Sequence, residues 1–205
     1  MEKTDKKTDI LNAASMLFSE FGFEGTSTRQ IAKESGANMA MINYYFGSKE
    51  GVFLQIMEEK ISGFKSQLDQ IKEEKISAKE KLLKVVDRYA TRILSNISFH
   101  KMMHREFSLT QRPEIFNQIK DAMAANRMVI EKIIESGIAD GSFRNVDIRL
   151  SILTIMGTIS MVAQSPFKAG DNIDINDDKE REVLRKRLVA HLQDLIITHL
   201  TAPNK

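Results

Sequence analysis

The sequence contains no cysteine and no apolar run long enough to cross a membrane, and both absences narrow its class. Without cysteine the chain can form neither a disulfide nor a thiolate metal site, which agrees with a reducing cytoplasm. Its most apolar segment, residues 148–163, is interrupted by arginine, serine and threonine, whereas a spanning helix needs about 20 apolar residues. Residues 1–7 also lack the apolar stretch of a signal peptide. We therefore expect a cytoplasmic protein without a membrane segment.

Excess positive charge is also scarce. The formal net charge is +2, and residues 1–50 hold six lysines and arginines against seven aspartates and glutamates. Bulk attraction to phosphates therefore cannot supply DNA binding in this part of the chain. Such binding would depend on where a few cations and backbone amides lie.

Apolar residues recur at steps of three and four along nearly the whole chain, which predicts an all-α fold of about nine helices. No segment reads as a strand, and there is no internal repeat. A length of 205 residues allows a small DNA-binding module plus a core-forming domain. We place a three-helix helix-turn-helix head at residues 1–47 and a larger helical domain for ligand binding and dimerisation at 48–205.

Helix boundaries in the head are marked by capping residues. Ser27 and Gln30 form a predicted capping box that opens a short second helix. Gly36 suits a left-handed turn after that helix, and Asn38 suits the N-cap of a third helix that runs to about residue 45. Two short helices joined by a glycine-containing turn predict a helix-turn-helix.

The larger domain shows comparable signals. Ser48 is expected to cap a long helix, and a second capping box at residues 77–80 opens a helix that extends to Ile97. A shorter helix follows at about residues 99–109. Pro113 suits the first turn of the next helix, which ends before residues 140–142. The last two helices are expected near 147–164 and 178–200, separated by a polar loop at 165–177.

The outward residues of the third helix carry the predicted chemistry. An amide side chain in the major groove can contact adenine through two hydrogen bonds, and Asn43 is placed to do so. Met39 and Met41 are placed to contact thymine methyl groups. Tyr44 and Tyr45 are candidates both for DNA contact and for packing, and we expect one of them to pack.

Three stretches of the head resemble a known family in register: residues 10–18 (ILNAASMLF), 25–38 (GTSTRQIAKESGAN) and 42–53 (INYYFGSKEGVF). They are similar to the N-terminal signature of the TetR family of bacterial regulators. The resemblance covers about the first quarter of the chain. The remainder is similar to the family only in the number and length of its helices.

The resemblance implies roles for individual positions of the head. Thr28 and Arg29 match positions that contact the DNA backbone, and Tyr45 and Lys49 match phosphate contacts. The predicted DNA-binding residues are Thr28, Arg29, Asn38, Met39, Ala40, Met41, Asn43, Tyr44, Tyr45 and Lys49. Asn43 stands where the family often has tyrosine, and Ala40 where it often has glycine. Because of these two departures, the resemblance does not predict the operator sequence.

A cluster of methionine and phenylalanine residues follows in the sixth and seventh helices. Such residues form ordinary cores, but methionine also lines adaptable cavities. The resemblance implies a small-molecule cavity between the fourth and seventh helices. Its predicted lining residues are Phe99, Met102, Met103, Phe107, Phe116 and Met123. These side chains favour a small hydrophobic or aromatic effector, although His104 and Arg105 would favour an anionic one. His100 and His104 lack a third ligand, so we expect no metal and no cofactor.

The helices near 147–164 and 178–200 are the candidates for dimerisation. The first is apolar on nearly all sides, which is unusual for the surface of a monomer. Paired with the second helix and their symmetry mates, it would form a four-helix bundle, as the resemblance also implies.

Together these features predict a transcriptional regulator and not an enzyme: a ligand-responsive repressor that binds a palindromic operator in double-stranded DNA as a homodimer. An activator fits the same sequence. The alternative from another class is a helical interaction protein that coats DNA without sequence preference or recruits a protein. Preference for one short palindrome over bulk DNA distinguishes the two classes.

Overall fold

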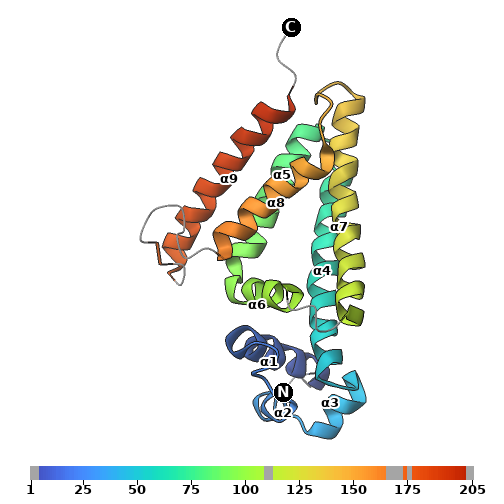
Figure 1. The fold of residues 1–205 in the computed structure, drawn as a ribbon, viewed down its shortest axis with the longest axis vertical. Helices are drawn as coiled ribbons and strands as arrows, with labels where there is room; N and C mark the ends of the chain where they lie inside the picture. The colour runs from blue at the N-terminus through green and yellow to red at the C-terminus, as the bar shows by residue number, and fades with distance from the viewer. Residues whose placement is uncertain (1–4, 109–112, 165–172, 175–176, 202–205) are drawn as a thin grey trace. The chain divides into compact units, whose positions relative to one another are not determined.

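The structure, a computed structural model, describes residues 5–108, 113–164, 173–174 and 177–201. Within these ranges the side chains of residues 107–108, 113–116 and 118 are not described. The described residues form nine helices and no strand, which confirms the predicted all-α fold (Figure 1). None of the helices in the described part is long and apolar enough to cross a membrane.

The helix boundaries lie close to the predicted ones. The helices are α1 (Lys6–Phe21), α2 (Thr28–Glu34), α3 (Met39–Phe46), α4 (Lys49–Glu73), α5 (Ala78–Ser95), α6 (Ile97–Ser108), α7 (Pro113–Ala139), α8 (Ile148–Gln164) and α9 (Asp178–Leu200). Most of the predicted polar loop at 165–177 lies outside the described residues.

Side-chain caps explain where several helices begin. The Ser27 side chain accepts a hydrogen bond from the Gln30 amide while the Ser27 amide donates to the Gln30 side chain, which confirms the first capping box. Ser77 and Glu80 form the second in the same way. At the start of α4, the Gly51 amide donates to the Ser48 hydroxyl at 3.2 Å.

One predicted helix boundary is wrong. The fifth helix was expected to include Ile97, but α5 ends at Ser95 and Asn96 has φ −144° and ψ 64°. Asparagine competes well with helical geometry by bonding its neighbouring backbone. Ile97 instead begins α6. Its side chain is buried, with 7% of its surface exposed. The sixth helix therefore starts two residues before the predicted Phe99, and Leu109 lies outside the described residues.

Contacts divide the chain into two compact units. The first comprises residues 1–63 and 98–123, and the second comprises residues 64–97 and 124–205. Both α4 and α7 contribute residues to each unit. The predicted domains, 1–47 and 48–205, are divided by function, whereas these units are divided by contacts. The functional division stays a prediction.

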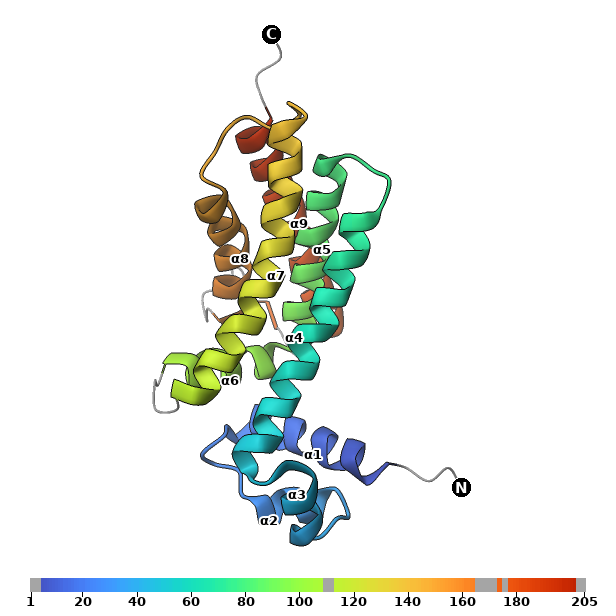
Figure 2. The same ribbon diagram turned by 90° about the vertical axis from the view of Figure 1, so that its right-hand side faces the viewer.

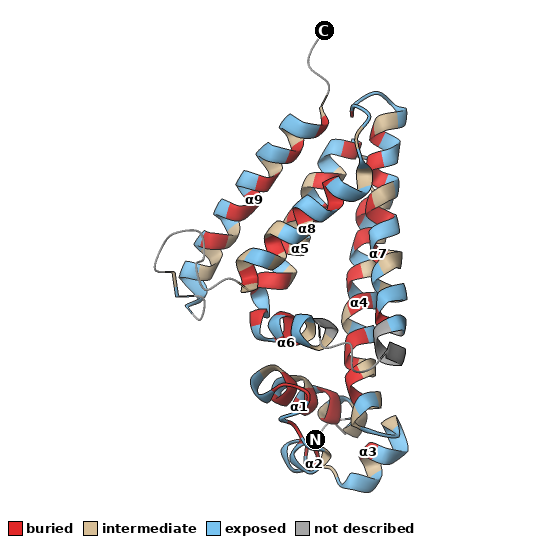
Figure 3. Ribbon diagram, in the orientation of Figure 1, coloured by how far each residue is buried: buried red, intermediate tan, exposed pale blue. Residues whose placement is uncertain are grey.

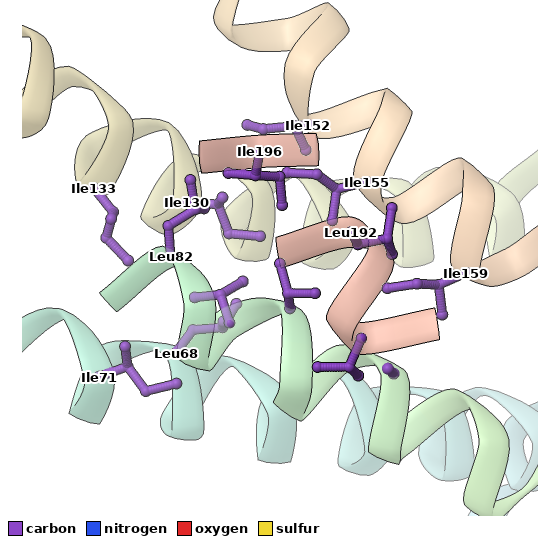
Figure 4. Close-up of a cluster of buried hydrophobic side chains, with 14 of the residues drawn as sticks. Leu68, Ile71, Leu82, Ile130, Ile133, Ile152, Ile155, Ile159, Leu192 and Ile196 are labelled. Carbon is purple, nitrogen blue, oxygen red and sulfur yellow. The ribbon is translucent and has the colours of Figure 1, made fainter. Parts of the chain in front are cut away.

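The second unit is built around a hydrophobic core to which α4, α5, α7, α8 and α9 contribute most of the side chains. Figure 4 shows isoleucine and leucine side chains from α4, α5, α7, α8 and α9 converging. Leu82 of α5, Ile159 of α8 and Leu192 of α9 are fully buried there. Arg185 of α9 adds a polar link, because its guanidinium donates to the Asp87 carboxylate of α5 at 2.5 Å.

The two faces of α8 differ in burial (Figure 3). Ile152, Ile155 and Ile159 lie in the core, with 4% of the surface or less exposed. The opposite face carries Leu150, Leu153 and Met161, which are 61%, 64% and 67% exposed. Spacings of three, eight and eleven residues place these three side chains on one stripe of the helix. Among the described residues, this helix, which is apolar on nearly all sides, therefore buries one face and leaves apolar side chains exposed on the other.

Candidate DNA-binding surface

The helix-turn-helix is formed by α2, α3 and the turn between them (Figure 2). Gly36 lies in that turn with φ 60°, the left-handed conformation predicted for it. Ile31 and Ile42, one from each helix, are fully buried and lie in the same core cluster. The packing of these buried side chains and the short turn together fix how α3 lies across α2.

The N-terminal half of α3 presents uncharged side chains to solvent. Ala40 and Asn43 are exposed, and Met39 is 42% exposed. Asn38 caps the helix, because its side-chain oxygen accepts a hydrogen bond from the Met41 amide at 2.9 Å. Its side-chain nitrogen still provides donors. The exposed side chains of residues 38–43 are therefore apolar groups and amides, without a charge.

The neighbouring tyrosines of α3, Tyr44 and Tyr45, differ in their exposure to solvent. Tyr44 is 84% exposed and Tyr45 is 38% exposed, and their rings meet edge to face with centroids 5.2 Å apart. Met41 was expected to face outward, but it is half-buried and packs against the core of the first unit. The predicted contact of Met41 with thymine stays a prediction, and only the exposed part of this half-buried side chain could make it.

Arg29 and Thr28 lie in the first turn of α2. Arg29 is exposed and Thr28 is half-buried, directly after the Ser27 cap. Because no acidic residue lies in this first turn, the Arg29 guanidinium is the charged group there. A phosphate contact by Arg29 is compatible with this exposure.

Lys49 has surroundings that the sequence did not indicate. It begins α4, and its ammonium donates to the carbonyl oxygens of Phe23 and Thr26, each at 2.9 Å. The same nitrogen lies 4.2 Å from the centroid of the Phe23 ring. The predicted phosphate contact by Lys49 stays untested, but the structure directs this cation to the loop between α1 and α2.

Sequence reasoning also missed a polar anchor at the end of α1. Thr26 is 2% exposed, and its hydroxyl is within 2.8 Å of the Gly22 carbonyl oxygen and 3.1 Å of that of Leu17. A threonine one residue before a capping box was the only signal available. Lys6 similarly reaches the turn of the helix-turn-helix, because its ammonium donates to the Ser35 carbonyl at 3.5 Å.

The residues predicted to line a ligand cavity have mixed surroundings. Phe99 and Met102 belong to the core of the first unit, 7% and 4% exposed, and Met103 packs against that core. Met123 is 43% exposed. The side chains of Phe107 and Phe116 lie outside the described residues. Their assignment to a cavity therefore stays a prediction.

A pocket of about 530 Å³ lies elsewhere, among α4, α5 and α9 of the second unit. It is lined by Ile71, Glu74, Leu83, Lys84, Asp87, Arg88 and Gln193. None of the predicted ligand-binding residues lines it. Four of its seven residues are charged, so its surface is a poor match for a purely apolar molecule.

His100 and His104 lie on one face of α6 with ring centroids 6.5 Å apart. His100 is buried and His104 is exposed. Among the side chains that the structure describes, no three histidine, aspartate or glutamate residues gather as metal ligands would. Arg105 of the same helix reaches the end of α1, where its guanidinium lies directly against the Cα of Gly22.

This geometry defines a helix-turn-helix protein, and comparisons with known proteins give its family. Residues 10–56 match the family model of bacterial regulatory proteins of the tetR family, and residues 75–164 match a tetracyclin repressor-like C-terminal domain. The HTH-type transcriptional repressor NicS from Pseudomonas putida is 30% identical over 155 residues, covering 70% of this chain and 69% of NicS. The fatty acid metabolism regulator protein from Bacillus subtilis is 26% identical over 159 residues, covering 77% and 81%.

Solved structures share the fold. The regulator FadR from Bacillus subtilis, in complex with stearoyl-CoA, superposes with a TM-score of 0.74 at 22% identity, covering 90% of this chain and 96% of FadR. A tetR-family regulatory protein from Rhodococcus RHA1 gives 0.76 at 21% identity, covering 98% and 100%.

The chain belongs to the tetR family of bacterial regulatory proteins, as the resemblance of its head indicated. It is a DNA-binding transcriptional regulator, which confirms the predicted class and the prediction that it is not an enzyme.

Replacing glycine with alanine at two positions should change stability in opposite directions. At Gly36, with φ 60°, alanine is strained and should lower the free energy of unfolding by about 1 kcal/mol. At Gly63, an exposed position inside α4 where an added Cβ meets nothing within 4 Å, alanine should raise it by up to about 1 kcal/mol. Urea unfolding at one protein concentration measures both. Equal effects of the two substitutions would contradict the left-handed turn.

Proposed function

We propose that the chain is a cytoplasmic, ligand-responsive repressor that binds a palindromic operator as a homodimer. The observation that carries the proposal is the exposed, uncharged face of α3 in a chain whose family consists of transcriptional regulators. Two relatives are named repressors: NicS and KstR2 of Rhodococcus jostii, the latter 23% identical over 175 residues.

Base reading by α3 follows from the chemistry of its exposed side chains. The Asn43 amide offers a donor and an acceptor to the N7 and N6 of adenine. Met39 and Ala40 offer apolar surface to the methyl group of thymine. We therefore expect A·T pairs where α3 meets the major groove. We expect contacts to the flanking DNA backbone or bases from Tyr44, Tyr45 and the amide nitrogen of Asn38. We expect contacts to phosphates from Arg29 and Thr28.

Homodimerisation is supported by the apolar stripe on α8. Leu150, Leu153 and Met161 are more than 60% exposed, and Val183 of α9 is 64% exposed. Apolar side chains gathered on one helix face mark an interaction surface more often than an ordinary solvated face. A two-fold dimer also matches the symmetry of a palindrome.

For the effector, the named relatives supply a specific candidate. A fatty acid metabolism regulator is among them, and FadR was solved with stearoyl-CoA. A long-chain acyl-CoA combines an apolar chain with an anionic head group, so it suits both the Met- and Phe-rich segment and its basic neighbours His104 and Arg105. We propose that an apolar ligand of this kind releases the operator by preferring the form of the protein that does not bind DNA.

At each half-site, Asn43→Ala should weaken binding about 5- to 150-fold, which corresponds to the 1–3 kcal/mol of one bidentate base contact, and the homodimer on a full palindrome should lose the square of that factor. The operator is first selected from random DNA, and affinity is then measured on every single-pair variant. The loss should fall to that of one contact on the variant that lacks the contacted adenine in one half-site, and it should vanish on a symmetric variant that lacks it in both. Asn12→Ala, the same change at an exposed position of α1, serves as the control and should leave affinity unchanged. Selection without any enriched sequence would favour a DNA-coating protein instead.

Leu153→Asp should raise the dissociation constant of the dimer about 100-fold or more, because each copy would bury an unpaired carboxylate. Sedimentation equilibrium measures this directly. Met128→Asp places the same charge on an apolar side chain of α7 that is 52% exposed, and it should leave the dimer intact. Ile155→Asp should unfold the chain, since Ile155 is 4% exposed in the core. A folded wild-type monomer at micromolar concentration would refute the dimer.

Stearoyl-CoA should raise the melting temperature of the protein and lower its affinity for the operator. The coupling is reciprocal, so operator DNA should weaken acyl-CoA binding by the same factor. Free CoA and a phosphorylated sugar serve as controls and should do neither. Tight acyl-CoA binding that leaves operator affinity unchanged would show a site without a switch, and the ligand-responsive part of the proposal would fail.

A further inference from the structure

The ammonium of Lys49 joins the two ends of the helix-turn-helix. Lys49 lies three residues after the end of α3, and the carbonyls that it contacts belong to the segment immediately before the cap of α2. The hydrogen bonds to Phe23 and Thr26 both measure 2.9 Å, which is short enough for charge-assisted bonds. The residues between these contacts and Lys49 contain the whole DNA-binding motif.

Both partners of Lys49 are themselves held firmly. Phe23 is 1% exposed, and its ring packs on those of Phe18 and Phe53 with centroids 5.4 and 5.2 Å apart. Thr26 is 2% exposed and is anchored by its hydroxyl to the end of α1. The ammonium also lies 4.2 Å from the centre of the Phe23 ring, a favourable position for a cation. Three separate interactions therefore keep Lys49 on the loop.

We propose that Lys49 is a positioning residue for DNA binding, and that it fixes α2 and α3 against the start of α4 while making no phosphate contact of its own. This inference rests on the proposed binding of an operator through α3. An ammonium has three N–H donors, and two of them are used on carbonyls that would lose a partner if the side chain turned to DNA. Arg29, exposed on α2, is the cation placed for phosphate.

Ionic strength distinguishes positioning from phosphate contact. Each cation that neutralises a phosphate contributes about −0.9 to the slope of log affinity against log salt concentration. A positioning residue contributes nothing to this slope, because it neutralises no phosphate itself: its loss lowers the fraction of molecules with α2 and α3 in the binding arrangement, and the bound form keeps the same phosphate contacts. Its removal should lower affinity by a similar factor at every salt concentration.

The first experiment compares Lys49→Met with Arg29→Met on the selected operator between 50 and 200 mM salt. Methionine keeps the apolar stem and removes the charge in both cases. Arg29→Met should reduce the slope by about 1.8, because a dimer carries two copies of Arg29, whereas Lys49→Met should lower affinity at least about fivefold with the slope unchanged. Lys49→Arg, which keeps donors for both carbonyls, should recover most of the affinity. A slope reduced by about 1.8 in Lys49→Met, or an affinity unchanged at every salt concentration, would overturn the proposal.

A second experiment needs neither DNA nor a variant that folds. Lysines of the wild-type full chain are labelled by reductive methylation, and the rates are read by mass spectrometry. Lys33, exposed on α2, should react at least about tenfold faster than Lys49. Lys49 reacting as fast as Lys33 would overturn the proposal, whatever the chain binds. If instead wild-type protein showed slow labelling of Lys49 but no operator preference, the proposed function would fail and the contact would stand.

Discussion

The position of the recognition helix depends on a hydrophobic core that α1, α2 and α3 cannot build alone. Isolated helices shorter than about 12–15 residues are marginal in water, and α2 and α3 have 7 and 8 residues. α3 contributes Ile42 as its buried residue. The core of the first unit is completed by side chains from α4, α6 and α7, namely Val52, Phe53, Ile56, Met57, Ile61, Phe99, Met102 and Ile119. The DNA-binding motif is therefore ordered by residues outside its own segment.

This shared core gives a physical route from α6 to the DNA-binding surface. Phe99 and Met102 of α6 pack in the same cluster as Ile31 and Ile42. The Arg105 guanidinium touches Gly22, four residues before Thr26, which Lys49 holds. A close-packed core transmits a displacement because it has few voids to absorb one. A ligand that displaces α6 would thus disturb the loop before α2 without touching α3.

The head could be predicted closely because its signals are local. The Ser27–Gln30 box, the Asn38 cap and the left-handed Gly36 depend on residues a few positions apart, and all three are present. Lys49 could not be predicted, because its partners Phe23 and Thr26 come close only once the fold has formed. The Met- and Phe-rich composition around Phe99 and Met102 likewise allowed both a core and a cavity, because the same residue types line both, so the sequence could not distinguish the two. Met41 shows the same limit in reverse, since a residue on an outward arc of α3 still reaches the core.

Low charge in the head would make the proposed dimerisation part of DNA recognition. With a net charge of −1 in residues 1–50 and Lys49 held by carbonyls, each head has few cations to spend on phosphates. A single head should therefore bind its half-site weakly and with a shallow dependence on salt. In the proposed dimer, a link between two heads through α8 and α9 would make the second contact intramolecular, which can raise affinity by 10²–10⁴ without any new contact. That gain exists only while the spacing of the heads matches the half-sites. A regulator built in this way can be switched off by a change in spacing, because neither head alone retains enough affinity to stay bound.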